Sequence, residues 1–205
     1  MSVAGLILAA GQGTRFGADK RLAVMPDGRT LLASSLQPYV GVCRPLLVVI
    51  RPDDMAAHDV AKACGAQIVV CTDADRGMGH SLAEGARALL EMPGVAGGGL
   101  KGVLIGLADM PRVSCTCLQA LQQALLASDR PVAPVHQGTL GQPRALPARY
   151  LPALARLQGD QGARHLLDWQ REALLLDVED PGVLLDVDTP EDLRTLPVLA
   201  AHQAN

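Results

Sequence analysis

Residues 2–20 read SVAGLILAAGQGTRFGADK, and this stretch decides how the rest of the chain is interpreted. It begins with an apolar run typical of a buried strand, passes through a glycine-rich loop, and carries the cations Arg15 and Lys20. A glycine-rich loop behind a strand lets the backbone approach phosphate groups closely. The stretch therefore predicts a buried first strand followed by a phosphate-binding loop. A pliable strand-to-helix turn with two solvated cations is the alternative that the glycines alone leave open.

The spacing of the glycines separates the classes of nucleotide-binding protein. Gly11, Gly13 and Gly17 give the pattern G-x-G-x-x-x-G, one residue longer than the fingerprint of dinucleotide-binding folds. The loop also lacks the G-K-[ST] ending of a P-loop. Both differences count against a hydride-transferring oxidoreductase and a P-loop hydrolase. What remains is a long loop whose backbone amides, Arg15 and Lys20 are all available to a triphosphate, with the oxidoreductase kept as a third alternative.

Short apolar runs alternate with longer Ala- and Leu-rich segments of helical period up to about residue 135. This alternation is typical of a mostly parallel sheet with helices on both faces, so we expect an α/β protein with a Rossmann-like three-layer α/β/α sandwich. The predicted strands are 3–9, 45–50, 67–71, 102–107 and 130–135. The predicted helices are 31–39, 53–64, 81–91 and 115–127, with Thr30 and Ser114 as N-caps and Gly65 as a C-terminal stop.

The pattern changes after His136. Residues 137–150, QGTLGQPRALPARY, predict a hairpin or an extended excursion. Two short helices are expected at 151–157 and 160–169, with Asp160 as the N-cap of the second. Strand-like segments at 173–178 and 183–185 then lead to a last helix, for which Thr189 is the expected N-cap. No linker divides the chain, and we expect one domain over residues 1–205.

Composition narrows the possible partners. The aromatic side chains are Phe16, Tyr39, Tyr150 and Trp169 and the net charge is −3, so a surface for stacking bases or binding a polyanion is not expected. No apolar run reaches membrane-spanning length. The five cysteines include no C-x-x-C pair, which favours small buried thiols in a reducing compartment. A cytoplasmic protein that binds neither nucleic acid nor membranes is therefore predicted.

Three aspartates are candidate ligands. Asp109 follows an apolar strand at its carboxyl end, where parallel α/β sheets bind ligands. An isolated aspartate there could also cap the next turn. Asp186 and Asp188 alternate along a predicted short strand and would share a face, although exposed acids at a helix entry are the alternative.

The segment LILAAGQGTRFGADK resembles the signature L-A-[AG]-G-x-[GS]-x-R-[MF]-G-x-x-K of the nucleotidyltransferases that make molybdenum cofactor dinucleotides. These are the MobA-like and MocA-like NTP transferases, whose fold is of the nucleotide-diphospho-sugar transferase type. The likeness continues in ADMP at 108–111, GMGHSL at 77–82, GQP at 141–143, LQGDQGAR at 157–164 and DVDTPEDL at 186–193. Ala10, where the guanylyltransferase branch has glycine, is similar to the molybdenum cofactor cytidylyltransferase branch and implies CTP as donor.

The resemblance also implies roles for individual residues. Arg15, Lys20 and Asp109 would be catalytic. The nucleotide would be bound by Leu8, Ala9, Ala10, Gly11, Gly13, Thr14, Arg15, Lys20, Gly79 and Ser81. Mg²⁺ would be held by Asp109 together with Asp188 or Asp186, with Asp188 preferred. The acceptor would be bordered by Gly141, Pro143, Gly159 and Arg164. A nucleotide-binding part of about 1–135 and an acceptor-binding part of about 136–188 follow.

The reaction implied is Mg²⁺-dependent transfer of CMP from CTP to the terminal phosphate of molybdopterin-bound molybdenum, with release of pyrophosphate. A molybdenum hydroxylase would be the client. Other phosphate acceptors, such as an isoprenoid or sugar alcohol phosphate, and GTP as donor remain open within the same chemistry. A non-catalytic molybdopterin carrier is the alternative from another class. The transferase requires that Lys20 and Asp109 meet at one site.

Overall fold

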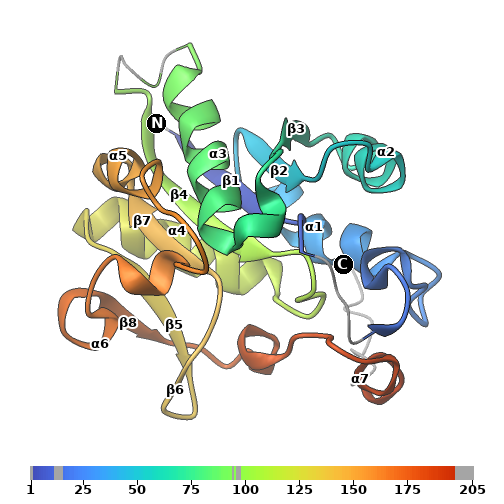
Figure 1. The fold of residues 1–205 in the computed structure, drawn as a ribbon. Helices are drawn as coiled ribbons and strands as arrows, with labels where there is room; N and C mark the ends of the chain where they lie inside the picture. The colour runs from blue at the N-terminus through green and yellow to red at the C-terminus, as the bar shows by residue number, and fades with distance from the viewer. Residues whose placement is uncertain (1, 12–15, 94, 96–97, 197–205) are drawn as a thin grey trace.

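The computed structural model describes residues 2–11, 16–93, 95 and 98–196. Within them, an eight-stranded sheet has the order β3-β2-β1-β4-β7-β5-β6, with β8 beside β5 (Figure 1). The strands are β1 Ser2–Leu8, β2 Leu46–Ile50, β3 Gln67–Val70, β4 Leu100–Leu107, β5 Val132–His136, β6 Thr139–Leu140, β7 Arg144–Pro147 and β8 Leu174–Asp177. The helices are α1 Leu31–Val40, α2 Met55–Ala63, α3 Met78–Glu91, α4 Cys115–Ser128, α5 Leu151–Leu154, α6 Trp169–Glu172 and α7 Pro190–Thr195.

The sheet has a parallel half formed by β3, β2, β1 and β4. Its central strands read as continuous apolar runs because helices bury both of their faces. Side chains of α1, α2 and α4 pack on one face, and those of α3, α5 and Trp169 pack on the other, where Figure 1 shows α3 and α5 in front of the sheet. The predicted three-layer, mostly parallel α/β/α sandwich is confirmed.

The second half of the sheet joins the parallel half through one antiparallel pair of strands, β4 and β7. The predicted hairpin is formed by β5 and β6, with His136 opposite Thr139. The chain then returns as β7, which pairs antiparallel with β4 from Ile105↔Arg144 to Gly102↔Pro147. Residues 144–147 are thus a buried interior strand rather than an excursion.

Two predicted elements of the second half are wrong. Residues 160–169 form no single helix: they hold a 3-10 turn at Ala163–His165 whose N-cap is Gly162, so Asp160 does not cap it. Gly159 and Gly162 weaken a helix there. Residues 183–185 are not a strand, because Val183 and Leu184 belong to the 3-10 turn Pro181–Leu184 and Leu185 caps its end. The Asp180 side chain accepts from the Gly182 amide at the start of this turn.

The predicted N-caps Thr30, Ser114 and Thr189 are confirmed. Thr30 and Ser114 accept hydrogen bonds from backbone amides at the start of α1 and α4. Thr189 forms a capping box, in which its hydroxyl accepts from the Asp192 amide at 3.2 Å and the Asp192 carboxylate accepts from the Thr189 amide at 2.7 Å. Gly65, with φ of 75°, follows α2 as the predicted stop.

All five cysteines are free thiols. Cys43, Cys71 and Cys117 are buried and Cys64 is half-buried, whereas Cys115 is exposed at the start of α4, so the prediction of buried thiols is wrong for Cys115. Burial raises the pKa of both Cys43 and Cys117 to about 12, which keeps these two thiols protonated and unreactive.

No helix in the described part of the chain combines the length and the apolar character that crossing a membrane requires.

Candidate active site

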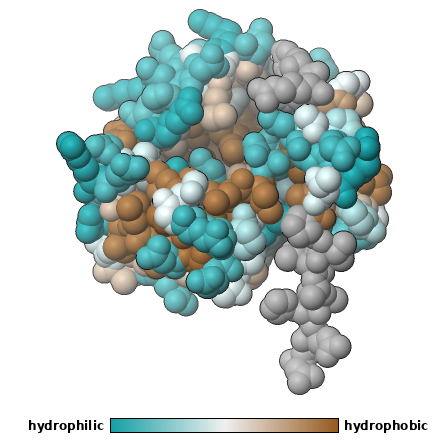
Figure 2. Space-filling model, turned by 90° about the horizontal axis from the view of Figure 1, so that it is seen from below, coloured by the Kyte–Doolittle hydropathy of each residue, from teal (hydrophilic) through white to brown (hydrophobic). Residues whose placement is uncertain are grey.

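A cavity of about 280 Å³ lies at the carboxyl ends of β1 and β4. Its walls are the end of β1 with the loop behind it, the end of β4 with Asp109, and the start of α3. Figure 2 looks onto the molecule from below Figure 1 and shows apolar residues in the recessed part of this surface, with hydrophilic residues around them. An apolar cleft with a few charged groups is the usual form of a small-molecule site.

Most of the residues predicted to bind the nucleotide line this cavity, namely Leu8, Ala9, Ala10, Gly11, Lys20 and Ser81. Asp109 lines it as well. Gly13, Thr14 and Arg15 lie outside the described residues. The cavity is therefore built on the glycine-rich loop and the strand end that the sequence singles out, and the contacts to a nucleotide stay predictions.

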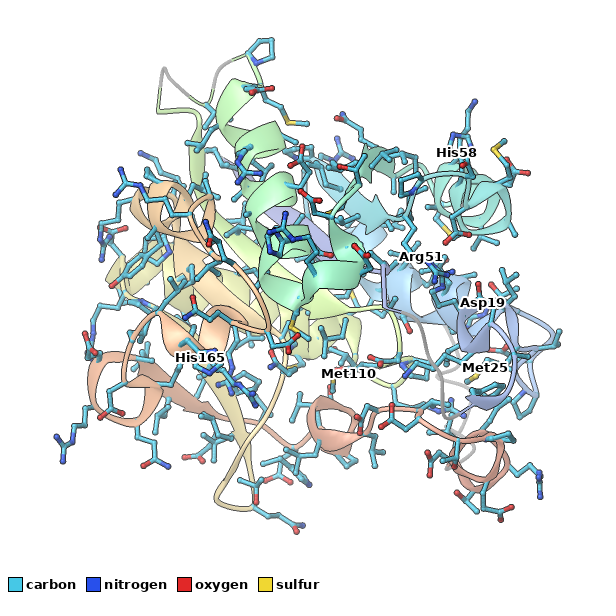
Figure 3. All side chains as sticks on the ribbon, viewed as in Figure 1. Asp19, Met25, Arg51, His58, Met110 and His165 are labelled. Atoms are coloured by element: carbon cyan, nitrogen blue, oxygen red, sulfur yellow. The ribbon has the colours of Figure 1, made fainter. Side chains whose placement is uncertain are left out.

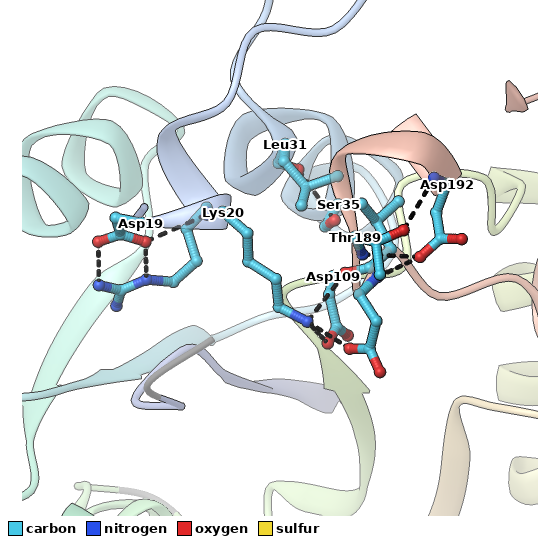
Figure 4. A network of polar contacts seen from close by, with 10 residues as sticks. Asp19, Lys20, Leu31, Ser35, Asp109, Thr189 and Asp192 are labelled. Carbon is cyan, nitrogen blue, oxygen red and sulfur yellow. Dashed lines mark hydrogen bonds and ion pairs between the residues drawn. The ribbon is translucent and has the colours of Figure 1, made fainter. Parts of the chain in front are cut away.

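Lys20 joins three distant segments of the chain. Its ammonium Nζ donates to Asp109 Oδ2 at 2.8 Å and to Asp188 Oδ1 at 2.9 Å (Figure 4). It also donates to the carbonyl oxygen of Val187 at 2.8 Å. Lys20 begins a 3-10 turn directly behind the glycine loop, Asp109 follows β4, and Asp188 precedes α7. The meeting of Lys20 and Asp109 that the transferase requires is thus present.

The environment of Lys20 keeps its side chain charged. Burial lowers the pKa of the ammonium, but the hydrogen bonds and charges of Asp109 and Asp188 outweigh this effect and the pKa is raised overall. A fixed positive charge therefore stands at the wall of the cavity. Such a charge suits a site in which negative charge develops on phosphate oxygens.

The acidic side of the site fits a small divalent cation. Asp109 Oδ1 is buried and has no hydrogen-bond partner, so one oxygen of this carboxylate remains available for a ligand. The described residues contain no group of three or more His, Cys, Asp or Glu side chains that could hold a metal. Mg²⁺ is commonly bound by one or two carboxylates plus substrate phosphates, and Asp109 with Asp188 meets that requirement.

Asp186 lies apart from this arrangement. Its side chain is exposed, and the residues around it form no strand, so the prediction that Asp186 and Asp188 share a strand face is wrong. No hydrogen bond or ion pair joins Asp186 to Lys20 in the described part of the chain. The segment is positioned instead by the Val187 amide, which donates to the Asp109 carbonyl at 2.9 Å.

Arg21 is a residue of the cavity wall that the sequence did not single out. Its side chain is 3% exposed, donates through Nη1 to the carbonyl oxygen of Ala9, and donates through Nε to Asp19 Oδ1 at 2.8 Å. It also forms an ion pair with Asp54 Oδ2 at 2.6 Å. Figure 3 shows Asp19 with Arg51 on this side of the molecule. Arg21 therefore ties the end of β1 to the start of α2. The signal in the sequence that could have identified Arg21 was its position as a second cation directly after Lys20.

Replacement of Arg21 by methionine is expected to lower the free energy of unfolding by about 3 kcal/mol, because it removes the cation 2.6 Å from the buried Asp54 carboxylate and leaves only Arg51, at 3.8 Å, beside it. Urea denaturation followed by circular dichroism measures this. Arg29→Met is the matched control, because Arg29 binds Asp27 two residues before it, just as Arg21 binds Asp19. The pair of Arg29 and Asp27 is exposed, so its loss should lower the free energy of unfolding by about 0.5 kcal/mol or less. Equal effects of the two substitutions would contradict the structural role of Arg21.

The glycines at the start of α3 allow another segment to approach closely. The Gly79 amide, which the sequence assigns to the nucleotide, donates to the carbonyl oxygen of Gly159 at 2.7 Å. A Cβ at Gly79 would lie 2.7 Å from the Gln158 carbonyl oxygen, and one at Gly77 would lie 2.4 Å from Gly159 backbone atoms. The segment that includes Gly159 is thereby seated on α3, beside Ser81 and the cavity.

The remaining residues predicted for the acceptor, Gly141, Pro143 and Arg164, do not line the cavity. The Gln142 amide, between Gly141 and Pro143, donates to the Val183 carbonyl at 2.8 Å. This contact fixes the start of β7 to the turn that leads to Asp188. Arg164 is exposed on the 3-10 turn Ala163–His165. Acceptor binding by these residues stays a prediction.

The fold and the site define a nucleotidyltransferase-type α/β protein. The model of the MobA-like NTP transferase domain matches residues 5–174, and the chain belongs to this family. The chain is 31% identical to the purine catabolism protein PucB of Bacillus subtilis, over 92% of each chain. It is also 31% identical to nicotine blue oxidoreductase of Paenarthrobacter nicotinovorans, over 95% of this chain and 96% of that protein.

Two further relatives bear on the chemistry. The 2-C-methyl-D-erythritol 4-phosphate cytidylyltransferase of Cereibacter sphaeroides is 29% identical, over 100% of this chain and 78% of that protein. Among solved structures, Rv0371c of Mycobacterium tuberculosis H37Rv superimposes with a TM-score of 0.76 at 26% identity, covering 95% of this chain and 97% of that one. A structure of Rv0371c in complex with manganese has a TM-score of 0.73 at 25% identity, over 95% of this chain and 96% of that one.

Proposed function

We propose that this protein transfers CMP from CTP to a phosphate acceptor of the molybdopterin type and releases pyrophosphate. The observation that carries the proposal is the meeting of Lys20, Asp109 and Asp188 at the wall of a cavity that begins at the glycine loop. Membership of the NTP transferase family supports the reaction class. The cytidylyltransferase among the relatives supports CTP, in agreement with Ala10 in the loop.

The reaction needs little covalent chemistry from the protein. An oxygen of the acceptor phosphate attacks the α-phosphorus of CTP and forms a new P–O bond, while the bond to the bridging oxygen breaks and pyrophosphate leaves with the electron pair. The acceptor phosphate is already ionised near neutral pH, so no general base is required. The protein must position the reactants and stabilise charge on the phosphate oxygens.

The residues divide this work between binding and charge stabilisation. Ala9, Ala10 and Gly11 would hold the nucleotide against the carboxyl end of β1, and Ser81 would face it from α3. Lys20, together with Arg15 of the loop, would stabilise the transferring phosphates. Asp109 and Asp188 would hold a divalent cation, Mg²⁺ in our proposal. When bound there, a divalent cation would supply positive charge that offsets the charge of the triphosphate and of the departing pyrophosphate. The manganese complex of Rv0371c supports divalent-metal use within the fold.

The test is pyrophosphate release from CTP, GTP, ATP or UTP with molybdenum-loaded molybdopterin, or with an isoprenoid or sugar alcohol phosphate, as acceptor, in Mg²⁺, in Mn²⁺ and in EDTA. We expect release with CTP and a divalent cation, and none in EDTA. Release with another nucleotide in place of CTP would contradict the proposed donor. Release only with an isoprenoid or sugar alcohol phosphate would contradict the proposed acceptor. Nucleotide binding without pyrophosphate from any pair would contradict the transferase and favour a carrier of molybdopterin.

A further inference from the structure

Arg144 is a buried cation without a counter-ion. The residue is 7% exposed, and its Nε and Nη1 are shielded from solvent with no hydrogen-bond partner. Over residues 2–11, 16–93, 95 and 98–196, no ion pair of Arg144 is formed either. Burial lowers the pKa of the guanidinium to about 10, so it stays charged at neutral pH. Arg21, in contrast, is equally buried but has two carboxylates beside it.

The aromatic ring beside Arg144 stabilises the positive charge of the guanidinium but accepts no hydrogen bond from its Nε or Nη1. Its guanidinium lies over the indole ring of Trp169, with 4.8 Å between Cζ and the ring centroid. The indole Nε1 donates to the Ala163 carbonyl at 3.1 Å, which fixes the ring in place. A ring face stabilises a cation, but it offsets only a minor part of the cost of removing a guanidinium from water. The N–H groups still lack an acceptor, which an oxyanion would supply.

The position of Arg144 relates it to the acceptor side of the site. Arg144 follows Pro143 at the start of β7 and is paired with Ile105 of β4, the strand that ends just before Asp109. Asp109 lies four positions after Ile105, in the turn that directly follows β4. The segment 163–169 supplies the ring over Arg144. In Figure 3, His165 of this segment lies on one side of Met110, and Asp19, which directly precedes Lys20, lies on the other.

We propose that Arg144 binds an oxyanion of the acceptor substrate, a phosphate or carboxylate group distinct from the phosphate that reacts. The assignment of this ligand to the acceptor rests on the proposed function, whereas the oxyanion chemistry rests on the unpaired guanidinium alone. Trp169 holds the guanidinium in a fixed plane, so two of its N–H groups can face the anion together. Because Nε and Nη1 are shielded from solvent and the Trp169 ring lies over the guanidinium, entry of the anion requires the Trp169 side chain to shift.

The experiment uses Trp169 as the reporter, since it is the single tryptophan of the chain. Inorganic phosphate is titrated into the wild-type protein at constant ionic strength maintained with sodium chloride, and tryptophan fluorescence is recorded. A saturable change is expected in the wild type and in Lys20→Met, which removes the donor-site cation. The change should be lost in Arg144→Met, whose melting temperature without phosphate should rise by a few degrees because the unpaired charge is gone.

Arg149→Met is the matched control. Arg149 also lies over an aromatic ring, Tyr150 at 5.3 Å, but it is exposed and bound to Asp129 at 2.7 Å. This variant should keep the phosphate response. Absence of a saturable response in the wild type would overturn the proposal even if Arg144→Met failed to fold. A response that survived in Arg144→Met, or that was lost in Lys20→Met, would also overturn it. Failure of the transferase assay with an intact phosphate response would refute the proposed function alone.

Discussion

Replacement of Asp109 by asparagine is expected to lower the rate of pyrophosphate release about a thousandfold while the fold persists. Asparagine has nearly the same shape, and β4 and the Asp109 backbone contact with Val187 do not depend on the carboxylate. The substitution removes the charge that would hold the metal and that now pairs with Lys20 at 2.8 Å. Initial rates at saturating CTP and Mg²⁺ measure the effect, and urea denaturation verifies the fold.

Asp186→Asn is the matched control, because it removes an exposed carboxylate two residues from Asp188 that does not contact Lys20. Its rate should stay within about twofold of the wild type, since an exposed charge at this range is largely screened. Full activity of Asp109→Asn would remove the metal assignment. A large loss in Asp186→Asn would show that Asp186 rather than Asp188 completes the site.

Replacement of Lys20 by methionine is expected to lower turnover by about two to three orders of magnitude, because a fixed cation that stabilises phosphate charge is lost. The same substitution should strengthen Mn²⁺ binding in the absence of nucleotide by about tenfold. The ammonium now binds Asp109 Oδ2 and Asp188 Oδ1, so it competes with a divalent cation for the same oxygens. Turnover and metal affinity should therefore move in opposite directions.

Mn²⁺ affinity is measured by isothermal titration calorimetry, and turnover by pyrophosphate release. Lys101→Met serves as the control: Lys101 is exposed near the start of β4, the opposite end of the strand from Asp109. This variant should match the wild type in both measurements. Unchanged metal affinity in Lys20→Met would separate the lysine from the metal site, and unchanged turnover would make its role purely structural.

The sequence predicted the parallel half of the sheet well because periodicity there reflects burial. The runs at 3–9, 45–50 and 102–107 are apolar throughout, as expected for strands covered on both faces. Strand β7 was missed because Pro143 precedes it, Pro147 is its last residue, and proline is typical of loops and strand ends. Its strand pairing comes from β4, some 40 residues earlier, and local sequence gives no sign of this partner.

The residues of the candidate site also divide into those that local sequence indicates and those that depend on distant contacts. Lys20 and Asp109 could be found because a glycine loop after β1 and an acid after β4 both reach the carboxyl edge of a parallel sheet. The roles of Arg21 and Arg144 could not, since they depend on which distant groups surround each guanidinium. Arg21 meets Asp54, whereas Arg144 meets only an aromatic ring among the residues described. Tertiary packing decides this difference.

The bond between Lys20 and Asp188 joins residues 168 positions apart. During synthesis, a ribosome must therefore release nearly the whole described chain before the second carboxylate can reach the lysine. A nascent protein that has β1 to β4 still lacks Asp188 at the proposed reaction centre. The proposed reaction centre is thus completed late in translation, when Val187 docks against Asp109.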